Sequence, residues 1–258
     1  MVVTSSKLNI RWEELPDYFV LPDDPVDNIS QPFIAAALGE SLSLANRIAD
    51  TALVTTNYGI CATVNNKTVV KAPDWAFIPN VTAPRADIER SYTPYLDGDP
   101  PLIVMEFLST TEGGEYSIKA THPPGKWFYY ETVLKVPYYV IFNPATADIE
   151  LYRLDDTGSY QLQLADDNHR YWIEEIALYL GVWEGRRDNR SGHWLRWWDQ
   201  QVQLLLWGSE LSEQIRQQAE KNVSDAVGKL LAMGLSPAQV ADALSLPEAT
   251  VTTIQSSD

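Results

Sequence analysis

The chain has 258 residues, of which 45% are hydrophobic and 11% aromatic, and its formal net charge at pH 7 is −16. This composition indicates a globular protein with a sizeable core, and the negative charge argues against a general binder of polyanions. The single cysteine, Cys61, excludes an intramolecular disulfide framework and fits a reducing compartment. No apolar run reaches the length of a membrane span, and residues 1–18 lack the apolar core of a signal peptide. We therefore expect a cytoplasmic protein with no membrane partner.

The N-terminal part of the chain predicts one helix followed by short strands. Residues 1–30 carry three prolines among acidic residues and are expected to run over the surface. A helix over residues 31–49 follows, with Ser30 as its cap and an apolar face. Further along, we expect strands over residues 53–58, 62–70 (turning at Asn65-Asn66) and 69–78, then a loop over residues 83–101.

The segment Pro100–Pro144 is the one around which the rest of the chain is organised. Residues 102–105 form a continuous apolar run, which is typical of a strand covered on both faces. Residues 136–142 form a second such run, rich in aromatic and β-branched side chains. Between the two, residues 126–134 place apolar side chains at helical spacing. This order predicts a strand, a helix and a second strand.

The C-terminal part predicts β-hairpins and then an all-helical tail. Hairpins are expected over residues 149–164 and 192–207. The composition changes near Gly208, after which residues 209–233 predict one long helix and residues 235–254 two short ones. We therefore divide the chain into residues 1–207 and a helical tail, residues 208–258.

The two short helices of the tail superficially resemble a helix-turn-helix. A tail that reads DNA should carry more Lys and Arg than Lys229, which is the one such residue among residues 222–254. We therefore favour packing or self-association through these helices, with contact to another protein as their role.

Two acidic residues interrupt apolar strands. Glu106 directly follows the apolar run 102–105, where a carboxylate must be paired, bound to a metal, or energetically costly. Asp74 follows Pro73 inside a second apolar segment. The ends of central strands are where α/β proteins tend to place their chemistry. The two acids are therefore the first candidates for a functional site.

The order of elements resembles the PD-(D/E)xK nuclease superfamily, and more closely the Uma-two group of restriction-endonuclease-like proteins of cyanobacterial type. The resemblance spans roughly residues 31–154. It is carried by APDWAFIP (72–79), PPLIVMEFLSTTEGGEYS (100–117), GKWFYYETVLKVPYYVIFNP (125–144) and IELYRL (149–154). It implies an α/β protein with a restriction-endonuclease-like fold, a mixed central sheet flanked by helices, to which the α-helical C-terminal appendage is added.

The resemblance also implies metal-dependent cleavage of phosphodiester bonds. The positions that match the family's ligands are Asp74, Glu106 and the backbone carbonyl of Phe107, which would hold Mg²⁺ (or Mn²⁺). A hard cation of this kind prefers oxygen ligands and keeps several waters. It activates one water and stabilises the charge that develops on the phosphate.

The site lysine departs from the superfamily pattern. Leu108 stands where that pattern has its lysine, so the E-x-K form is absent. The Uma-two group takes the lysine from the following helix in a K-x-x-x-Y context, which Lys126 and Tyr130 match. The resemblance therefore makes Lys126 the third catalytic residue, beside Asp74 and Glu106.

The acid that members of the group usually place shortly before this lysine is missing. His122 stands at the corresponding spacing. Glu112, Glu115 and His122 are the alternatives for its role, and Glu40 of the first helix is a further accessory candidate.

Each candidate has an ordinary structural alternative. For Asp74 the alternative is an ordinary acidic residue in a turn, and for Glu106 it is one half of a salt bridge. For Lys126 and Glu40 the alternative is a solvated residue on a helix. The tryptophans at 194, 197 and 198 are more typical of a core than of base stacking.

The leading functional hypothesis is a magnesium-dependent endonuclease that acts on nucleic acid, with DNA as the expected substrate, and works as a homodimer. The main alternative is a catalytically inactive protein of the same fold that serves as a binding or protein-interaction module. A third hypothesis is a DNA-binding regulator that acts through residues 235–254.

Overall fold

The computed structural model describes residues 8–16, 19, 29–109 and 114–256. Internal contacts divide the chain into two compact units, Met1–Leu205 and Leu206–Asp258. Within the described ranges, no helix combines the length and the apolar character that a membrane crossing requires.

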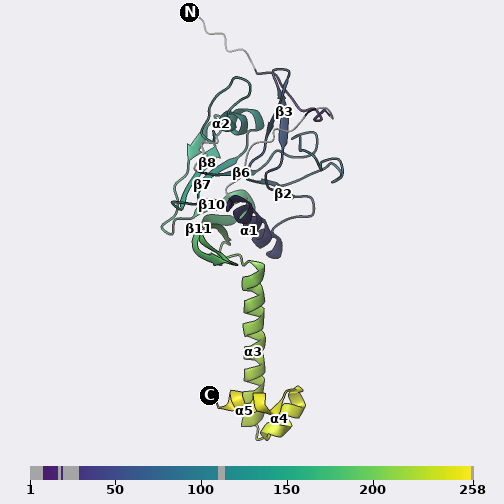
Figure 1. The fold of residues 1–258 in the computed structure, drawn as a ribbon, viewed down its shortest axis with the longest axis vertical. Coiled ribbons are helices and arrows are strands. Elements are labelled where there is room, and N and C mark those ends of the chain that lie inside the picture. The colour runs from purple at the N-terminus through teal and green to yellow at the C-terminus, as the bar shows by residue number, and fades with distance from the viewer. Residues whose placement is uncertain (1–7, 17–18, 20–28, 110–113, 257–258) are drawn as a thin grey trace, which may run out of the picture. The chain divides into compact units, whose positions relative to one another are not determined.

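The first unit is built on a six-stranded mixed sheet (Figure 1). Its strand order is β2-β5-β6-β7-β8-β9, and β6 and β7 run parallel while every other neighbouring pair is antiparallel. A parallel pair needs a long crossover connection, and residues 108–137 supply it. The strands are β2 (Leu53–Thr55), β5 (Trp75–Ile78), β6 (Ile103–Phe107), β7 (Tyr138–Asn143), β8 (Asp148–Leu154) and β9 (Tyr160–Leu162).

A short helix and a small sheet cover one face of the main sheet. The crossover contains α2 (Lys126–Phe128), which continues into the π-helix η1 (Tyr129–Leu134). The small sheet has the order β1-β3-β4 and comprises β1 (Ile10–Arg11), β3 (Ile60–Val64) and β4 (Lys67–Lys71). Side chains from η1, β3, β4, β6 and β7 form one hydrophobic cluster.

The turn between β3 and β4 confirms the predicted turn at Asn65-Asn66. Asn65 and Asn66 have φ values of 51° and 63°. Two successive residues with positive φ form the type I′ turn, whose twist matches that of a two-residue hairpin. Asparagine tolerates this conformation better than most residues, so the local sequence determines the turn.

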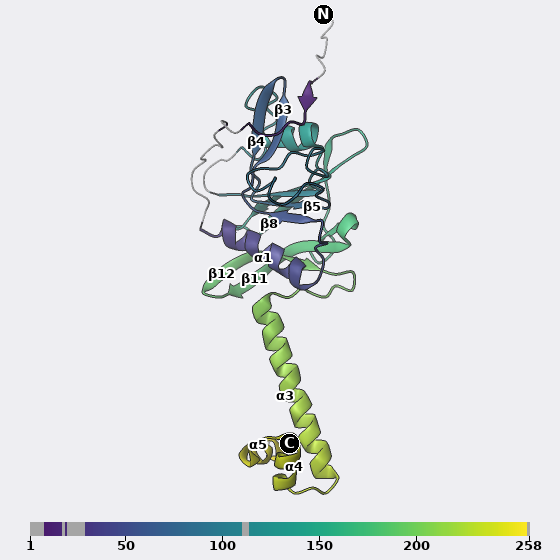
Figure 2. The ribbon, with the colours of Figure 1, turned by 90° about the vertical axis from the view of Figure 1, so that its right-hand side faces the viewer.

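Helix α1 (Gln31–Leu44) lies on the opposite face, against β12 of a third sheet (Figure 2). That sheet has the order β10-β11-β12 and contains β10 (Tyr171–Ile173), β11 (Leu178–Arg187) and β12 (Arg190–Trp198), with the 3₁₀ turn η2 (Glu174–Ile176) between β10 and β11. The helix ends five residues before the predicted end, because Asn46 adopts a left-handed conformation with φ of 54°. Ser30 is the N-cap residue, as predicted, although its side chain makes no capping hydrogen bond.

Two predictions about strands are wrong, one about a single strand and one about a hairpin. The expected strand 69–78 is two strands, β4 and β5, which belong to different sheets and are separated by residues 72–74. The break follows from Pro73, whose nitrogen cannot donate to a ladder. The expected hairpin 192–207 is reduced to a single bridge between Trp198 and Leu204, because β12 pairs along its length with β11.

The tryptophan cluster is confirmed as core. Trp194, Trp197 and Trp198 are all buried, and Trp197 is 0% exposed. The ring centroids of Trp197 and Trp75 of β5 lie 6.0 Å apart, which joins the third sheet to the main sheet. Cys61 is also buried, and burial raises the pKa of its thiol to about 11, so it is a core thiol rather than a nucleophile.

The second unit consists of three helices, α3 (Gly208–Ala232), α4 (Pro237–Leu244) and α5 (Glu248–Gln255). Val227, Val240, Ala241 and Val251 form its core. The left-handed Ser245, with φ of 53°, ends α4 and turns the chain into α5. The three predicted helices are confirmed to within a few residues, and a short turn joins α4 to α5.

Replacing Trp197 with Ala is expected to destabilise the first unit by about 3–5 kcal/mol, since it empties a fully buried position. Urea unfolding followed by circular dichroism measures this as a lower midpoint with an unchanged slope. Trp172→Ala is the control, because Trp172 is 37% exposed and should cost far less. Equal losses in both variants would contradict the assignment of Trp197 to the core.

Candidate functional site

The two acids lie next to each other at one edge of the main sheet. Asp74 directly precedes β5, and Glu106 is the fourth residue of β6. The antiparallel register pairs Trp75 with Met105, so one step further brings Asp74 beside Glu106. The backbone N–H of Phe107 donates to Oδ2 of Asp74 at 2.5 Å, which fixes this carboxylate against β6.

Glu106 is buried, and each of its two carboxylate oxygens accepts a hydrogen bond. Its side chain is 1% exposed. Tyr130 Oη donates to its Oε1 at 2.8 Å, and Lys126 Nζ donates to its Oε2 at 2.9 Å. Burial raises the pKa of Glu106 to about 7; the charge of Asp74 adds to the rise, while Lys126 and Tyr130 oppose it. Two adjacent carboxylates therefore compete for positive charge at this edge of the sheet.

Lys126 bridges two carboxylates. Its Nζ lies 2.9 Å from Glu106 and 3.3 Å from Oε1 of Glu115. Burial alone would lower the pKa of Lys126, but the attraction of Glu106, Glu115 and Asp74 outweighs it and raises the pKa. The ammonium group therefore keeps its proton and acts as a fixed positive charge rather than as a proton acceptor.

The π-helix carries two consecutive tyrosines that reach Glu106 and the small sheet. Tyr129 and Tyr130 are its first two residues, and both are buried. Tyr129 Oη donates to the carbonyl oxygen of Ile60 at 3.0 Å, while Tyr130 bonds Glu106. Lys135 has φ of 56° and ends the π-helix. The helix predicted over residues 126–134 is thus present, but three of its residues form an α-helix and six form a π-helix.

Helix α1 contributes a contact to the third proposed ligand. The side-chain amide of Gln31 donates to the carbonyl oxygen of Phe107. Gln31 is buried at the first position of α1. No sequence signal marks this residue, because the contact depends on how α1 docks against the sheet. The role of Tyr130 was better marked, since it lies one helical turn after Lys126.

Glu115 is held in place through its neighbours. Its backbone carbonyl accepts from Tyr139 Oη at 3.0 Å, and Ser117 packs tightly against Gly125 at the start of α2. A Cβ atom on Gly125 would lie 2.0 Å from the carbonyl oxygen of Ser117. Glycine is required here because the two backbones approach so closely, and this approach sets Glu115 beside Lys126.

The other accessory candidates have different surroundings. Glu40 forms an ion pair with Arg187 of β11. His122 is exposed; desolvation and the charges of Lys67, Lys119 and Lys71 lower its pKa. Glu112 lies outside the described residues.

The oxygen atoms at this edge of the sheet are of the kind that a divalent cation prefers. Across residues 8–16, 19, 29–109 and 114–256, no group of three or more His, Cys, Asp or Glu has the geometry of a metal site. Asp74, Glu106 and the Phe107 carbonyl supply two carboxylates and one neutral oxygen. That set fits Mg²⁺, which is commonly held by one or two carboxylates together with water and phosphate oxygens.

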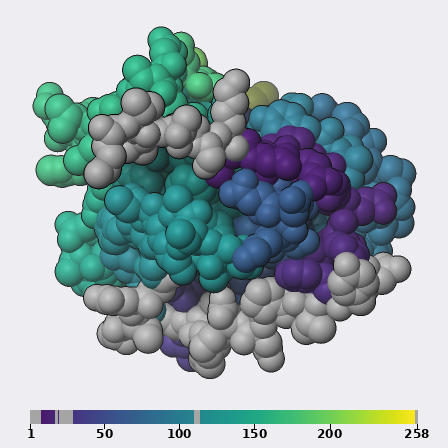
Figure 3. Space-filling model, turned by 90° about the horizontal axis from the view of Figure 1, so that it is seen from above, coloured from purple at the N-terminus to yellow at the C-terminus, as the bar shows by residue number. Residues whose placement is uncertain are grey.

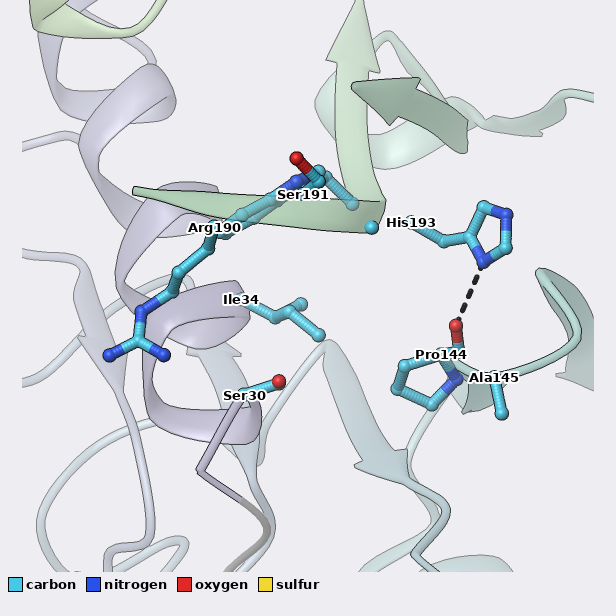
Figure 4. Close-up of a pocket in the computed structure, with 9 residues that line it drawn as sticks. Ser30, Ile34, Pro144, Ala145, Arg190, Ser191 and His193 are labelled. Atoms are coloured by element: carbon cyan, nitrogen blue, oxygen red, sulfur yellow. Dashed lines mark hydrogen bonds between the residues drawn. The ribbon is translucent and has the colours of Figure 1, made fainter. Parts of the chain in front are cut away.

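Two hollows open near this edge of the sheet. One has a volume of about 530 Å³ and is lined by Leu108, Ser109, Gly114, Glu115, Tyr116, Ser117 and Asn143. The other, of about 230 Å³, lies between the start of α1, the end of β7 and β12. Figure 4 shows Ser30 and Ile34 facing its open space, His193 bonded to the Pro144 carbonyl at 2.9 Å, and Arg190 pointing away from His193.

The guanidinium of Arg190 lies over the Phe33 ring, 3.7 Å from its centroid. In the smaller hollow, the guanidinium of the lining residue Arg190 is therefore already in contact with Phe33. The larger hollow is lined by Glu115, which forms an ion pair with Lys126, and by Leu108, which directly follows Phe107 in the chain.

The fold and the acid–acid–lysine cluster define a mixed α/β protein of the restriction-endonuclease-like class. The family model named Uma2 and described as "Putative restriction endonuclease" matches residues 14–187, more than half of the chain. The chain therefore belongs to the Uma2 family, which confirms the resemblance and extends it beyond residues 31–154.

The solved structures include a relative with limited similarity. It is a protein from Anabaena variabilis, described as a "putative nuclease belonging to DUF820". The identity is 12% and the TM-score 0.42, over 61% of this chain and 80% of that one. No curated protein matches the chain.

Gly125→Ala is expected to lower the free energy of unfolding by about 1–3 kcal/mol, because the added methyl group overlaps Ser117. Thermal melting is the measurement. Gly192→Ala serves as control, since a Cβ there meets no atom within 4 Å. A harmless Gly125→Ala would show that Ser117 and Glu115 are not held by this contact.

The stability of the Glu106→Gln variant relative to the wild type is expected to increase as the pH rises. The folded-state pKa of Glu106, about 7, lies above its ordinary value of 4.5. The wild type therefore loses stability between roughly pH 4.5 and 7 as the buried carboxyl ionises, by up to about 3 kcal/mol. Urea unfolding in EDTA at several pH values measures the difference. A difference that does not change with pH would contradict a raised pKa.

Proposed function

We propose that the protein is a metal-dependent endonuclease that cleaves phosphodiester bonds in nucleic acid, with DNA as the substrate. The observation that carries the proposal is the convergence of Asp74, Glu106 and Lys126 from three separate segments onto one sheet edge. Membership of a family described as "Putative restriction endonuclease" supports the same conclusion.

Asp74, Glu106 and the Phe107 carbonyl are the residues that would hold Mg²⁺ or Mn²⁺. The bound cation would supply an activated water and neutralise charge on the phosphate. The acids are prepared for such a cation by their proximity, because the charge of Asp74 raises the pKa of Glu106 and so disfavours its ionisation. Gln31 and Tyr130 orient two of the three ligands through their hydrogen bonds.

Lys126 contributes charge and position. Because its ammonium group stays protonated, it can orient the attacking water or stabilise the developing negative charge, but it cannot accept the proton. Glu115 fixes the ammonium from the opposite side at 3.3 Å. Among the three alternatives for the missing acid, Glu115 is therefore the one we propose.

The second candidate function is a protein of this fold that binds without cleaving. It is favoured by one observation: both oxygens of Glu106 already accept hydrogen bonds, from Tyr130 and Lys126, so its charge is compensated within the protein. The chain's net charge of −16 also opposes the approach of a polyanion.

The helical tail is proposed as a protein-contact module rather than a DNA reader. Residues 235–254 contain two acidic residues and no Lys or Arg. A helix-turn-helix without cations lacks the phosphate contacts that supply most of the affinity for DNA. Deleting residues 206–258 should therefore leave DNA binding intact. The homodimer and the cytoplasmic location stay predictions.

The decisive experiment compares the wild type with Asp74→Ala and Glu106→Ala. Mn²⁺ binding is measured by calorimetry, and cleavage of plasmid, linear and single-stranded DNA is followed with Mg²⁺ or Mn²⁺. We expect each variant to lose metal binding and to lose cleavage by at least about 100-fold, because each removes a ligand of the same ion.

Glu40→Ala is the matched control, since Glu40 pairs with Arg187 and should leave both readouts unchanged. Metal binding that is equal in the wild type and both acid variants would reject the metal site and leave the binding protein as the better description.

A further inference from the structure

One wall of the larger hollow beside the site is a turn that several contacts hold in place. Residues 114–117 form a turn in which the Ser117 N–H donates to the Gly114 carbonyl at 3.0 Å. Within this turn, the Glu115 carboxylate forms an ion pair with Lys126, and the Glu115 carbonyl accepts a hydrogen bond from Tyr139. Ser117 packs closely against Gly125. The turn is thus anchored to α2, β7 and the crossover rather than left as a free loop. Figure 3 shows the teal crossover region beside the blue β3–β4 hairpin at this face.

Tyr116 presents an aromatic face from this wall. Its side chain is 46% exposed, yet its hydroxyl donates to Oε1 of Glu150 on β8 at 2.7 Å. Glu150 in turn accepts a bond from Tyr152 on the same strand. The ring is therefore held at its far end while its surface stays open. An aromatic ring fixed in this way offers contact area at a low cost in conformational entropy.

The hollow beside Tyr116 has the chemistry for a neutral, planar, polar ligand. Its described lining combines the Tyr116 ring and Leu108 with the polar side chains of Ser109, Ser117 and Asn143. None of these lining residues is Lys or Arg, and Glu115 is acidic. A phosphate group is therefore disfavoured there. A volume of about 530 Å³ is within the range of small-molecule sites.

The position of the hollow relates this ligand to the proposed reaction. Two lining residues relate the hollow to the acid cluster, since Leu108 directly follows Phe107 and Glu115 forms an ion pair with Lys126. A nucleotide whose phosphate is bound at the acid cluster would carry its base within reach of the neighbouring space. We propose that this hollow binds one base of the cleaved strand, unstacked from its neighbours and stacked on Tyr116. This inference rests on the proposed nuclease function and adds the recognition of a base to it.

The test separates bases from backbone charge. Fluorescently labelled 12-mers of dA, dC and dT are compared with a 12-mer of abasic deoxyribose phosphates, which has the same charge, in buffer containing Ca²⁺. Tyr116→Ala is expected to weaken binding of at least one base-containing strand by roughly 5- to 100-fold, in keeping with the loss of one stacked base. Binding of the abasic strand should change less than about 2-fold.

Two variants act as matched controls. Tyr116→Phe keeps the ring and should keep most of the affinity, and Trp172→Ala removes an exposed aromatic ring from β10 and should have no effect. A base-specific site also predicts that a strand containing 5-iodouracil cross-links to Tyr116 of the wild type on irradiation. This readout does not depend on the folding of any variant.

Several results would overturn the proposal. Equal losses on the abasic and base-containing strands would make Tyr116 a purely structural residue. Unchanged binding of every strand by Tyr116→Ala, or cross-links that map away from Tyr116 and the other described lining residues, would remove the base site. A wild type that binds Mn²⁺ but no strand would reject the base site and leave the metal site. A wild type that binds neither would reject both.

Discussion

The burial of Glu106 is the constraint on which the rest of the site depends. A carboxylate that is 1% exposed within β6 has to be compensated, and this requirement brings Lys126 and Tyr130 to it from the crossover. The crossover can supply both because Lys126 and Tyr130 lie four residues apart, about one helical turn. Lys126 in turn attracts Glu115, and the backbone contact of Ser117 with Gly125 allows Glu115 to stay there. One costly charge thus orders residues that are distant in the sequence.

The main sheet explains why the site lies where it does. A parallel β6–β7 pair brings the ends of both strands to the same edge, and the antiparallel β5 brings its beginning there. Pro73 cannot donate to a strand ladder, so the preceding strand pairing ends before it. Asp74 is the next residue, and its carboxylate accepts a hydrogen bond from the Phe107 N–H. The same pairing pattern places Asn143, at the end of β7, beside Leu108 in the larger hollow.

Much of this could be predicted from local sequence. The Asn65-Asn66 turn, the two apolar central strands and the three C-terminal helices each carry their signal within a few residues. Asp74 and Glu106 could be identified because they interrupt apolar runs. The pairing of β12 with β11 could not, since local sequence does not decide whether β12 pairs with the strand before it or with the segment after it. Gln31 could not be identified either, because its contact exists only once α1 has docked.

The π-helix also has a consequence for how such a site tolerates changes in length. A π turn amounts to one extra residue in an α-helix. The wider turn absorbs that residue, so deleting one residue between Tyr130 and Leu134 would restore regular α turns with little rotation of Lys126 relative to β7. A residue deleted from a regular α-helix would instead rotate the two flanking segments by about 100° relative to each other. The π-helix is therefore a place where the crossover can lose a residue while Lys126 stays beside Glu106.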